Sequence, residues 1–163
     1  MDRIKIERYS EDWRQEVLSL TIRAWDPVFR LMEEDVPSFV FEAFYPDGWR
    51  KRQSKDVADL LDKMGDSVWL ATKDKALVGF MGLTFHPEDK MSEIGIIAVD
   101  PRHQREGIAK KLMTFAEQQS REAGAVMIMV ETVGDRGHSP ARKSYEASGY
   151  EPWPVARYFK SIK

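Results

Sequence analysis

The segment spanning residues 91–130 constrains the fold more than any other part of the sequence. An apolar run over residues 91–99 is followed, after the junction HQREGIAKKL, by apolar positions at helical spacing over residues 108–119. Gly124 stands where a helix of this length would end, and a second apolar run, residues 125–130, follows at once. A strand, a helix and a strand in this order predict a right-handed crossover between parallel neighbours. The near-continuous apolar character of the second run predicts a central strand covered on both faces.

Most of the remaining sequence divides into strands and helices. Ile4 and Ile6 alternate with charged residues and predict a short first strand. Ser10 is a candidate N-cap for a helix that ends just before Pro27, and a second helix should end before Gly65. An antiparallel meander is expected from three strand-like runs, which cover residues 68–72, 76–85 and 91–99. A short helix over 140–148 and a last strand over 155–159 complete the chain.

Length, charge and composition exclude several classes of protein. A chain of 163 residues with 42% apolar residues fits one domain, residues 1–163, with a single core. A net charge of -2 gives no general reason to expect nucleic acid, so any anion site must be local. The absence of cysteine removes disulfides and thiolate zinc sites, and no metal is expected. The N-terminus lacks the apolar core of a signal peptide and no run is long enough to span a membrane, so a cytoplasmic protein without a membrane partner is expected.

The junction between the strand and the helix has the features of an anion site. A helix N-terminus leaves up to four backbone N–H groups unpaired and carries about half a positive charge. Gly107 has no Cβ, so a phosphate can approach the main chain closely, while Ala109 keeps the next exposed position small. Arg105 and Lys110 add positive charge at the rim. The alternative is that Gly107 only eases a tight turn; the P-loop and dinucleotide-binding glycine patterns do not fit.

Two segments carry a resemblance to a known family. Residues 94–101 followed by Gln104-Arg105-Glu106-Gly107-Ile108-Ala109 resemble the acetyl-CoA binding motif of the GNAT N-acetyltransferase superfamily, [QR]xxGx[GA]. Residues 141–150, ARKSYEASGY, resemble the later AxxxYExxGF segment of that superfamily at the expected distance. The resemblance implies an α/β (α+β by some schemes) GNAT fold: a mixed, mostly antiparallel sheet of about six to seven strands with splayed parallel fourth and fifth strands, flanked by about four helices.

The resemblance also implies where acetyl-CoA binds as co-substrate. The exposed main chain of the splayed fourth strand would pair with the pantetheine arm, and the amides at the start of the following helix would hold the pyrophosphate. Carried over residue by residue, the cofactor-binding positions are Ile97, Ala98, Val99, Gln104, Arg105, Glu106, Gly107, Ile108, Ala109, Lys110, His138, Ala141 and Tyr145. Ile97 and Val99 can pack their side chains in the core while their main chain binds.

Three residues are candidates for catalysis. Tyr145 matches the tyrosine that protonates the departing sulfur in many relatives, and a phenol of pKa about 10 suits that task. Glu93 stands where several relatives carry a base or a ligand of the substrate ammonium; even spacing places Glu93 and Val99 on one face and Ile94 on the other. The alternative for Glu93 is a surface ion pair. His138 replaces a common pantetheine-binding asparagine and is a donor, a relay member or a structural histidine.

The acceptor and the class of function stay open at this level. Residues 25–49 combine acids at 26, 33, 34 and 35 with aromatic residues that include Trp25, Phe29, Phe41, Phe44, Tyr45 and Trp49. This combination suggests a cationic small-molecule amine held by carboxylates and aromatic faces. The alternative is that these aromatics are core and the acids are solvated. The leading function is an N-acetyltransferase acting on a primary amine by direct attack in a ternary complex. A protein lysine or N-terminal acetyltransferase and a silent acyl-CoA binding module are the rivals, and a homodimer is left open.

Overall fold

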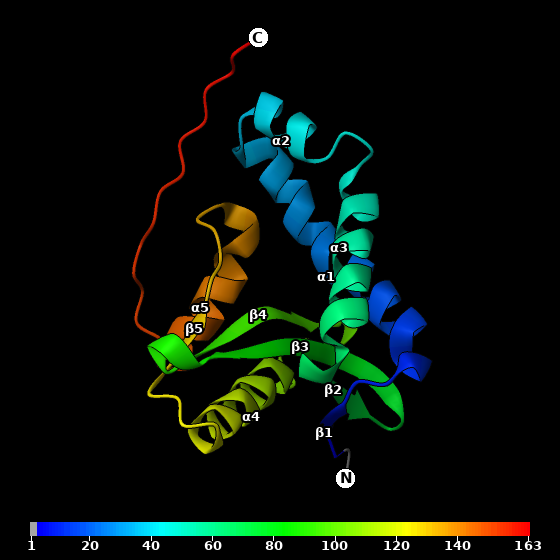
Figure 1. The fold of residues 1–163 in the computed structure, drawn as a ribbon. Helices are drawn as coiled ribbons and strands as arrows, with labels where there is room; N and C mark the ends of the chain where they lie inside the picture. The colour runs from blue at the N-terminus through cyan, green and yellow to red at the C-terminus, as the bar shows by residue number, and fades with distance from the viewer. Residues whose placement is uncertain (1–2) are drawn as a thin grey trace.

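The computed structural model describes residues 3–163 and shows one mixed sheet between layers of helices (Figure 1). The sheet has the order β1-β2-β3-β4-β5, in which all neighbours are antiparallel except the parallel pair β4 and β5. The strands are β1 (Lys5–Arg8), β2 (Val68–Lys73), β3 (Ala76–His86), β4 (Met91–Val99) and β5 (Met127–Val130). The antiparallel meander and the parallel crossover are therefore confirmed.

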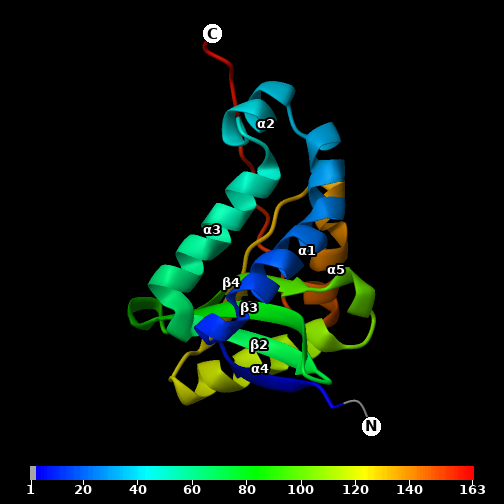
Figure 2. The same ribbon diagram turned by 90° about the vertical axis from the view of Figure 1, so that its right-hand side faces the viewer.

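Residues 3–163 also form five α-helices, whose arrangement around the sheet is clearest when Figures 1 and 2 are taken together. They are α1 (Arg14–Asp35), α2 (Ser38–Phe44), α3 (Trp49–Met64), α4 (Ile108–Glu122) and α5 (Ser139–Ala147). The helices α1 and α3 pack together over one face of the sheet, α4 covers the other, and α2 closes the far end of the α1–α3 pair. None of the helices within residues 3–163 is both long and apolar enough to cross a bilayer.

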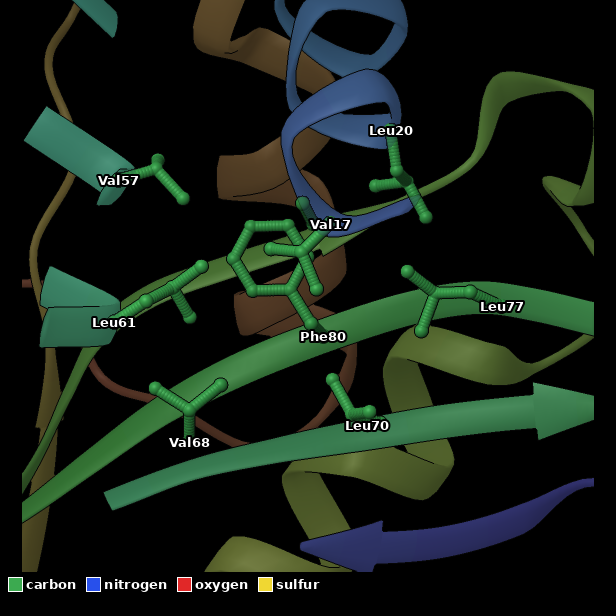
Figure 3. Close-up of a cluster of buried hydrophobic side chains, with 9 residues drawn as sticks. Val17, Leu20, Val57, Leu61, Val68, Leu70, Leu77 and Phe80 are labelled. Atoms are coloured by element: carbon green, nitrogen blue, oxygen red, sulfur yellow. The ribbon is translucent and has the colours of Figure 1, made fainter. Parts of the chain in front are cut away.

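The core has one apolar cluster on each face of the sheet. Under α1 and α3, Phe80 of β3 is fully buried among Val17, Leu20, Leu61 and other side chains (Figure 3). On the other face, the buried side of α4 presents Ile108, Leu112, Met113 and Ala116 to Val78, Met81 and Ile94. Because β3 and β4 contribute to both clusters, their main chain is held rigidly between two packed layers.

The first long helix does not end at Pro27, so that prediction is wrong. Helix α1 continues to Asp35 with Pro27 inside it. The proline removes one hydrogen bond to the carbonyl of Arg23, a cost that packing beyond the proline offsets. Phe29 is 4% exposed, and Asp35 accepts hydrogen bonds from Arg136, so both anchor the second half of the helix.

The last part of the sheet also differs from the prediction. The segment 155–159 forms no strand, and the described residues contain five strands rather than six or seven. As a result β5 is an edge strand rather than a central one, with Met127 52% exposed. The apolar character of residues 125–130 therefore does not reflect a central position in the sheet, because no strand among residues 3–163 lies beyond β5.

Candidate active site

The strand β4 separates from β5 halfway along its length. Parallel pairing runs only from Met91 opposite Met127 to Ile94 opposite Val130, where β5 ends. Beyond this point β4 keeps β3 on one side, with Met81 opposite Ile97 and Phe80 opposite Ala98, and has no strand among residues 3–163 on the other. The main chain of Ile97, Ala98 and Val99 therefore has an open edge, as predicted.

A bulge in β4 changes which side chains share a face. The register shifts between Gly82 and Leu83 of β3, so that their partners are Ile96 and Ile94 and Gly95 is the extra residue. Ile94 and Val99 consequently both pack in the cluster under α4, while Ile96 and Ala98 join the cluster under α1 and α3. The expectation that Glu93 and Val99 share a face is wrong, because strict alternation does not continue through a bulge. Glu93 still faces away from its neighbour Ile94.

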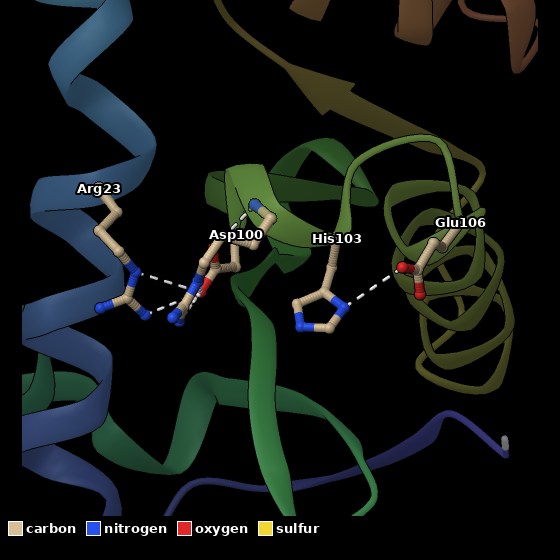
Figure 4. Close-up of polar contacts among 5 residues, drawn as sticks. Arg23, Asp100, His103 and Glu106 are labelled. Carbon is tan, nitrogen blue, oxygen red and sulfur yellow. Dashed lines mark hydrogen bonds and ion pairs between the residues drawn. The ribbon is translucent and has the colours of Figure 1, made fainter.

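Asp100 fixes the turn that follows β4 (Figure 4). Its side chain is fully buried and accepts hydrogen bonds from the Arg102 main chain at 3.0 Å and guanidinium at 2.7 Å, and from Arg23 of α1 at 2.8 Å. Its own N–H donates to the carbonyl of Val78 at 2.9 Å. The Arg102 hydrogen bonds, assisted by Arg23, hold the pKa of the Asp100 carboxyl well below its ordinary value. The turn is therefore tied to both β3 and α1.

The junction ahead of α4 has the geometry of an anion cradle. Arg105 and Gly107 both adopt left-handed backbone conformations, with φ of 65° and 77°. The first helical bond of α4 runs from the Lys111 N–H to the Gly107 carbonyl at 3.0 Å, so the three N–H groups of residues 108–110 have no acceptor within the helix. A Cβ added at Gly107 would meet no atom within 4 Å, so the main chain is open to a ligand. Left-handed turns at helix N-termini form such anion-binding concavities.

The acidic residue inside this cradle is neutralised by its neighbours. Glu106 pairs with Lys73 at the end of β2 at 2.8 Å and with His103 at 3.3 Å. The Lys73 hydrogen bond lowers the pKa of Glu106, which keeps the carboxylate charged and directed to Lys73. Gln104, Arg105 and Lys110 are exposed around the cradle, while Ile108 is buried and Ala109 packs beneath. Glu106 thus closes the turn instead of repelling an anion.

Tyr145 and Ala141 lie on α5, one turn apart. Tyr145 packs with Tyr150 at 6.1 Å between ring centroids, at the edge of the cluster under α4. Burial raises the pKa of Tyr145, so its hydroxyl keeps its proton through neutral and mildly alkaline pH. Burial, with Glu117 and Tyr145 nearby, raises the pKa of Tyr150 to about 12, and its hydroxyl is buried without a partner among residues 3–163.

Glu93 forms a hydrogen bond across the β3–β4 hairpin. Its Oε2 lies 2.8 Å from Nε2 of His86, and the other ring nitrogen of His86 lies 3.8 Å from Glu88. Glu93 and His86 are each about one third exposed. Where the alternative reading of Glu93 expects a surface ion pair, the structure shows a hydrogen bond to a histidine ring. An imidazole is a side chain that can transfer protons.

His138 lies in a short turn ahead of α5 and pairs with Asp135. Its Nδ1 is 2.6 Å from Asp135 Oδ1, and the Asp135 side chain is 7% exposed. Arg142 donates to the carbonyls of Val133 and Asp135 at 2.6 and 2.8 Å, which fixes the loop before the helix. If Nδ1–H of His138 donates this hydrogen bond to Asp135, the Nε2 atom of a neutral ring is left as an acceptor.

The sequence matches a family model over residues 8–150, described as the acetyltransferase (GNAT) family. The chain belongs to the acetyltransferase (GNAT) family. This match spans the open stretch of β4, the cradle before α4, and α5 with Tyr145.

The sequence identity between this chain and individual acetyltransferases is low. The chain is 31% identical over 96 residues, 58% of its length, to mycothiol acetyltransferase of Thermomonospora curvata, and this match covers 31% of that relative. The structure superposes on aminoglycoside N-acetyltransferase AAC(6')-Iy in complex with CoA with a TM-score of 0.64 and 13% identity, over 100% of this chain and 97% of that one. It superposes on the PaiA N-acetyltransferase of Thermoplasma acidophilum in complex with coenzyme A with a TM-score of 0.67 and 15% identity, over 94% and 93%. The GNAT fold is therefore confirmed.

Most of the aromatic and acidic side chains in the segment expected to hold the acceptor already contact other residues of the chain. Phe29 stacks on Trp49 at 4.5 Å between centroids and meets the edge of Tyr45 at 5.1 Å. Asp26 pairs with Arg30 and Arg50, and Glu34 and Asp35 both pair with Arg136. Three of the four acids proposed to bind a cationic acceptor thus already have arginine partners, and the aromatic rings pack on one another.

The sequence analysis did not identify several residues that contact or support the candidate site. Three of them are His86, Asp100 and Lys73, which contact Glu93, Arg23 and Glu106 from elsewhere in the chain. These partners are 7, 77 and 33 positions apart, and no local pattern predicts such contacts. Asp135 could have been found, because an aspartate three residues before His138 is a common N-cap arrangement.

Proposed function

We propose that the chain, as one domain over residues 1–163, is an acetyl-CoA-dependent N-acetyltransferase that acts on the primary amine of a small molecule. The observation that carries the proposal is the continuity between the open edge of β4 at residues 95–99 and the cradle at residues 105–110. An open strand edge can hydrogen-bond an extended amide-containing arm, and the cradle suits its diphosphate. One continuous segment of main chain thus offers both kinds of contact in sequence.

The residues present fit acetyl-CoA as co-substrate. Added Cβ atoms at Gly95 and Gly107 would meet nothing within 4 Å, so both stretches of main chain can be approached closely. Ile97, Ala98 and Val99 would hold the pantetheine arm, and the amides of residues 105–110 would hold the diphosphate. Acetyl-CoA supplies the acetyl group as a thioester.

The proposed reaction is direct attack of the amine on the thioester carbonyl carbon, with formation of a C–N bond and loss of the C–S bond. Glu93 accepts the proton that the amine must lose, directly or through water, since an ammonium has no free electron pair. A main-chain N–H near Val99 polarises the carbonyl. Tyr145 donates its proton to the departing sulfur, and burial favours this role because it keeps the phenol neutral.

The proposal that the acceptor is a small molecule has separate support. The names of the relatives describe acetyltransferases of mycothiol and of aminoglycosides, which are small molecules. The arginine-paired acids between Asp26 and Asp35 do not support strong selection for a polycation. The acceptor panel should therefore include neutral and acidic amines beside aminoglycosides and polyamines.

Two measurements test the proposal. Calorimetric titration at low salt should show binding of acetyl-CoA, and thiol release from acetyl-CoA should increase with at least one member of the amine panel. Acetylation of peptide arrays but not of small amines would support the protein-directed alternative. Binding without thiol release in any arm would support the silent module, and no binding would refute the whole proposal.

A further inference from the structure

A cavity of about 390 Å³ lies between α1, the start of α3 and the turn that follows β4. Arginines from all three elements line it: Arg23 of α1, Arg50 of α3 and Arg102 of the turn. The acids in its wall are Asp26 and Asp100. Sites for small molecules typically measure roughly 300–1,000 Å³. The cavity, here called the arginine cavity, therefore has the size of a small ligand and a positively charged lining.

The arginines around this cavity outnumber the acids that pair with them. Each of two carboxylates is shared by two arginines: Asp26 by Arg30 and Arg50, and Asp100 by Arg23 and Arg102. Because a carboxylate carries one negative charge and a guanidinium one positive charge, a positive charge is left over at each carboxylate. Ion pairs that only stabilise the fold would need one arginine for each acid. The excess charge therefore favours the binding of an anion.

The guanidinium groups also keep hydrogen-bond donors that the protein does not use. Arg23 and Arg102 each donate to Asp100 through Nε and Nη2, and Arg50 donates to Asp26 through Nη2. Within residues 3–163, Nη1 of each of these three arginines has no hydrogen-bond acceptor. Guanidinium groups recognise carboxylates and phosphates through such pairs of N–H groups. The buried Asp100 thus holds two guanidinium groups at the cavity wall, each with donors to spare.

The arginine cavity is next to the open edge of β4 but separate from the anion cradle. Asp100, in the cavity wall, directly follows Val99, the last residue of that edge. None of residues 105–110, which form the cradle, lines the cavity. Figure 4 shows Arg23 and Asp100 on one side of the turn and Glu106 beside α4 on the other. A ligand in the cavity is therefore beside the end of β4 where the thioester is proposed to bind, and it is not the diphosphate in the cradle.

We propose that the arginine cavity binds the acidic group, a carboxylate or a phosphate, of the amine that the protein acetylates. The inference rests on the proposed function, and it narrows the acceptor to amines that also carry a negative charge. A polycation such as an aminoglycoside would meet the like charges of three arginines here. The amine of an acidic acceptor is left free to reach the thioester, because a guanidinium has no atom that accepts a hydrogen bond from an ammonium.

Matched pairs of amines test this inference by steady-state kinetics. β-Alanine and phosphoethanolamine carry an acidic group, whereas β-alaninamide and ethanolamine have the same amine without it. The acidic member of each pair should have the lower KM, by roughly tenfold or more. Arg50→Gln should raise the KM for the acidic amines by about tenfold and affect the neutral amines much less.

Arg30→Gln is the matched control for Arg50→Gln. Arg30 pairs with the same carboxylate, Asp26, but it does not line the arginine cavity. Its change should leave the preference for acidic amines as it is in the parent chain. Equal KM values within each pair of amines, or equal effects of the two variants on the acidic amines, would overturn the inference.

A binding measurement separates failure of this inference from failure of the proposed function. NMR can follow the Nε–H signals of Arg23, Arg50 and Arg102 in ¹⁵N-labelled protein while phosphoethanolamine is added without acetyl-CoA. These signals should shift in the parent chain and equally in Gly107→Asp, because the cradle is not the site. Binding here without acetylation of any amine would refute the proposed function and keep the cavity as an anion site. Acetylation of amines without any shift would refute the inference and leave the proposed function intact.

The cofactor is a second source of a phosphate group, since acetyl-CoA carries a 3′-phosphate in addition to its diphosphate. Calorimetric titration with acetyl-CoA and with its 3′-dephospho form distinguishes this source from the acceptor. In Arg50→Gln the ratio of the two affinities should be the same as in the parent chain. If Arg50→Gln weakens the binding of acetyl-CoA but not of the 3′-dephospho form, the cavity binds the 3′-phosphate and the inference is wrong.

Discussion

Nε2 of His86 on β3 lies 2.8 Å from Oε2 of Glu93 on β4, and this hydrogen bond orients the carboxylate that we propose as the base. The bulge at Gly95 lies beyond Glu93, so the end of the β3–β4 hairpin keeps a regular register. Thr84 is opposite Glu93 and His86 is opposite Met91, which places His86 diagonally across from Glu93 on the same face. Glu88, 3.8 Å from the other ring nitrogen and largely exposed, extends the contact toward solvent. Glu93 is thus hydrogen-bonded to a ring that is itself about one third exposed to solvent.

Changes at this pair should separate the base from the residue that positions it. Glu93→Gln should lower kcat by roughly a hundredfold or more, because the amide cannot accept the proton. His86→Ala removes one hydrogen bond and should lower kcat by roughly tenfold with little change in the KM for acetyl-CoA. His86→Gln, which can still donate to Glu93, should recover most of the loss. Steady-state kinetics over a range of pH provide the measurement, and full activity of Glu93→Gln would assign the base elsewhere.

Removal of one hydroxyl from each of two neighbouring tyrosines tests the proton donor. Tyr145→Phe should lower turnover by roughly a hundredfold while acetyl-CoA affinity, measured by calorimetry, is nearly unchanged. Tyr150→Phe is the matched control: its hydroxyl is buried without a partner in residues 3–163, so its loss should leave turnover intact and raise stability by up to about 1 kcal/mol. Equal kinetic losses in the two variants would indicate a packing effect and not proton donation.

Two glycines at opposite ends of α4 test the anion cradle. Gly107 and Gly124 both have left-handed φ, 77° and 85°, and open space where a Cβ would be placed. Aspartate at either position should cost about 1 kcal/mol of folding stability because of the backbone conformation. Only Gly107→Asp should abolish acetyl-CoA binding in a calorimetric titration, because its carboxylate would lie where the diphosphate is expected. Loss of binding in both variants, or in neither, would contradict the assigned site.

The sequence was sufficient for the parts of this structure that depend on local patterns. The crossover from β4 through α4 to β5 follows from the periodicity of residues 91–130, and Gly124 takes the left-handed conformation expected at the helix end. The anion cradle is likewise predicted from local sequence, since unpaired amides at the start of a helix require only Gly107 and the helix itself. The assignment of the functional residues within this frame stays a prediction.

Features that depend on distant contacts were not accessible. The helix passes through Pro27 because Phe29, Asp35 and Arg136 hold its second half, and Arg136 is 101 positions from Asp35. The bulge at Gly95 places Val99 on the opposite face from the one that strict alternation predicts. An isolated glycine inside a strand is a local signal of a bulge, and the prediction of strict alternation did not use it. Likewise, the aromatic and β-branched residues within 155–159 predict a strand but not whether the described chain offers it a partner.

Asp100→Asn should destabilise the fold in a manner that depends on pH. The buried carboxylate binds Arg23 and Arg102, and its pKa lies below the ordinary value of 3.8. A group whose pKa is lowered by folding contributes stability above its unfolded pKa, and this contribution is lost as the pH falls toward the folded value. Near neutral pH the amide should cost about 2 kcal/mol in urea denaturation, through weaker hydrogen bonds to both arginines, and below about pH 4 the difference from the parent chain should shrink.

The control for this change is an acid whose ion pair is exposed. Asp62 lies 2.7 Å from Arg14, but its side chain is 58% exposed, so Asp62→Asn should have a much smaller effect at neutral pH. Asp100→Asn should also weaken acetyl-CoA binding, because Asp100 anchors the turn that leads into the cradle, whereas Asp62→Asn should not. If the two variants lose equal stability, or if the loss at Asp100 is the same at acid and neutral pH, the buried carboxylate does not fix this turn as the structure indicates.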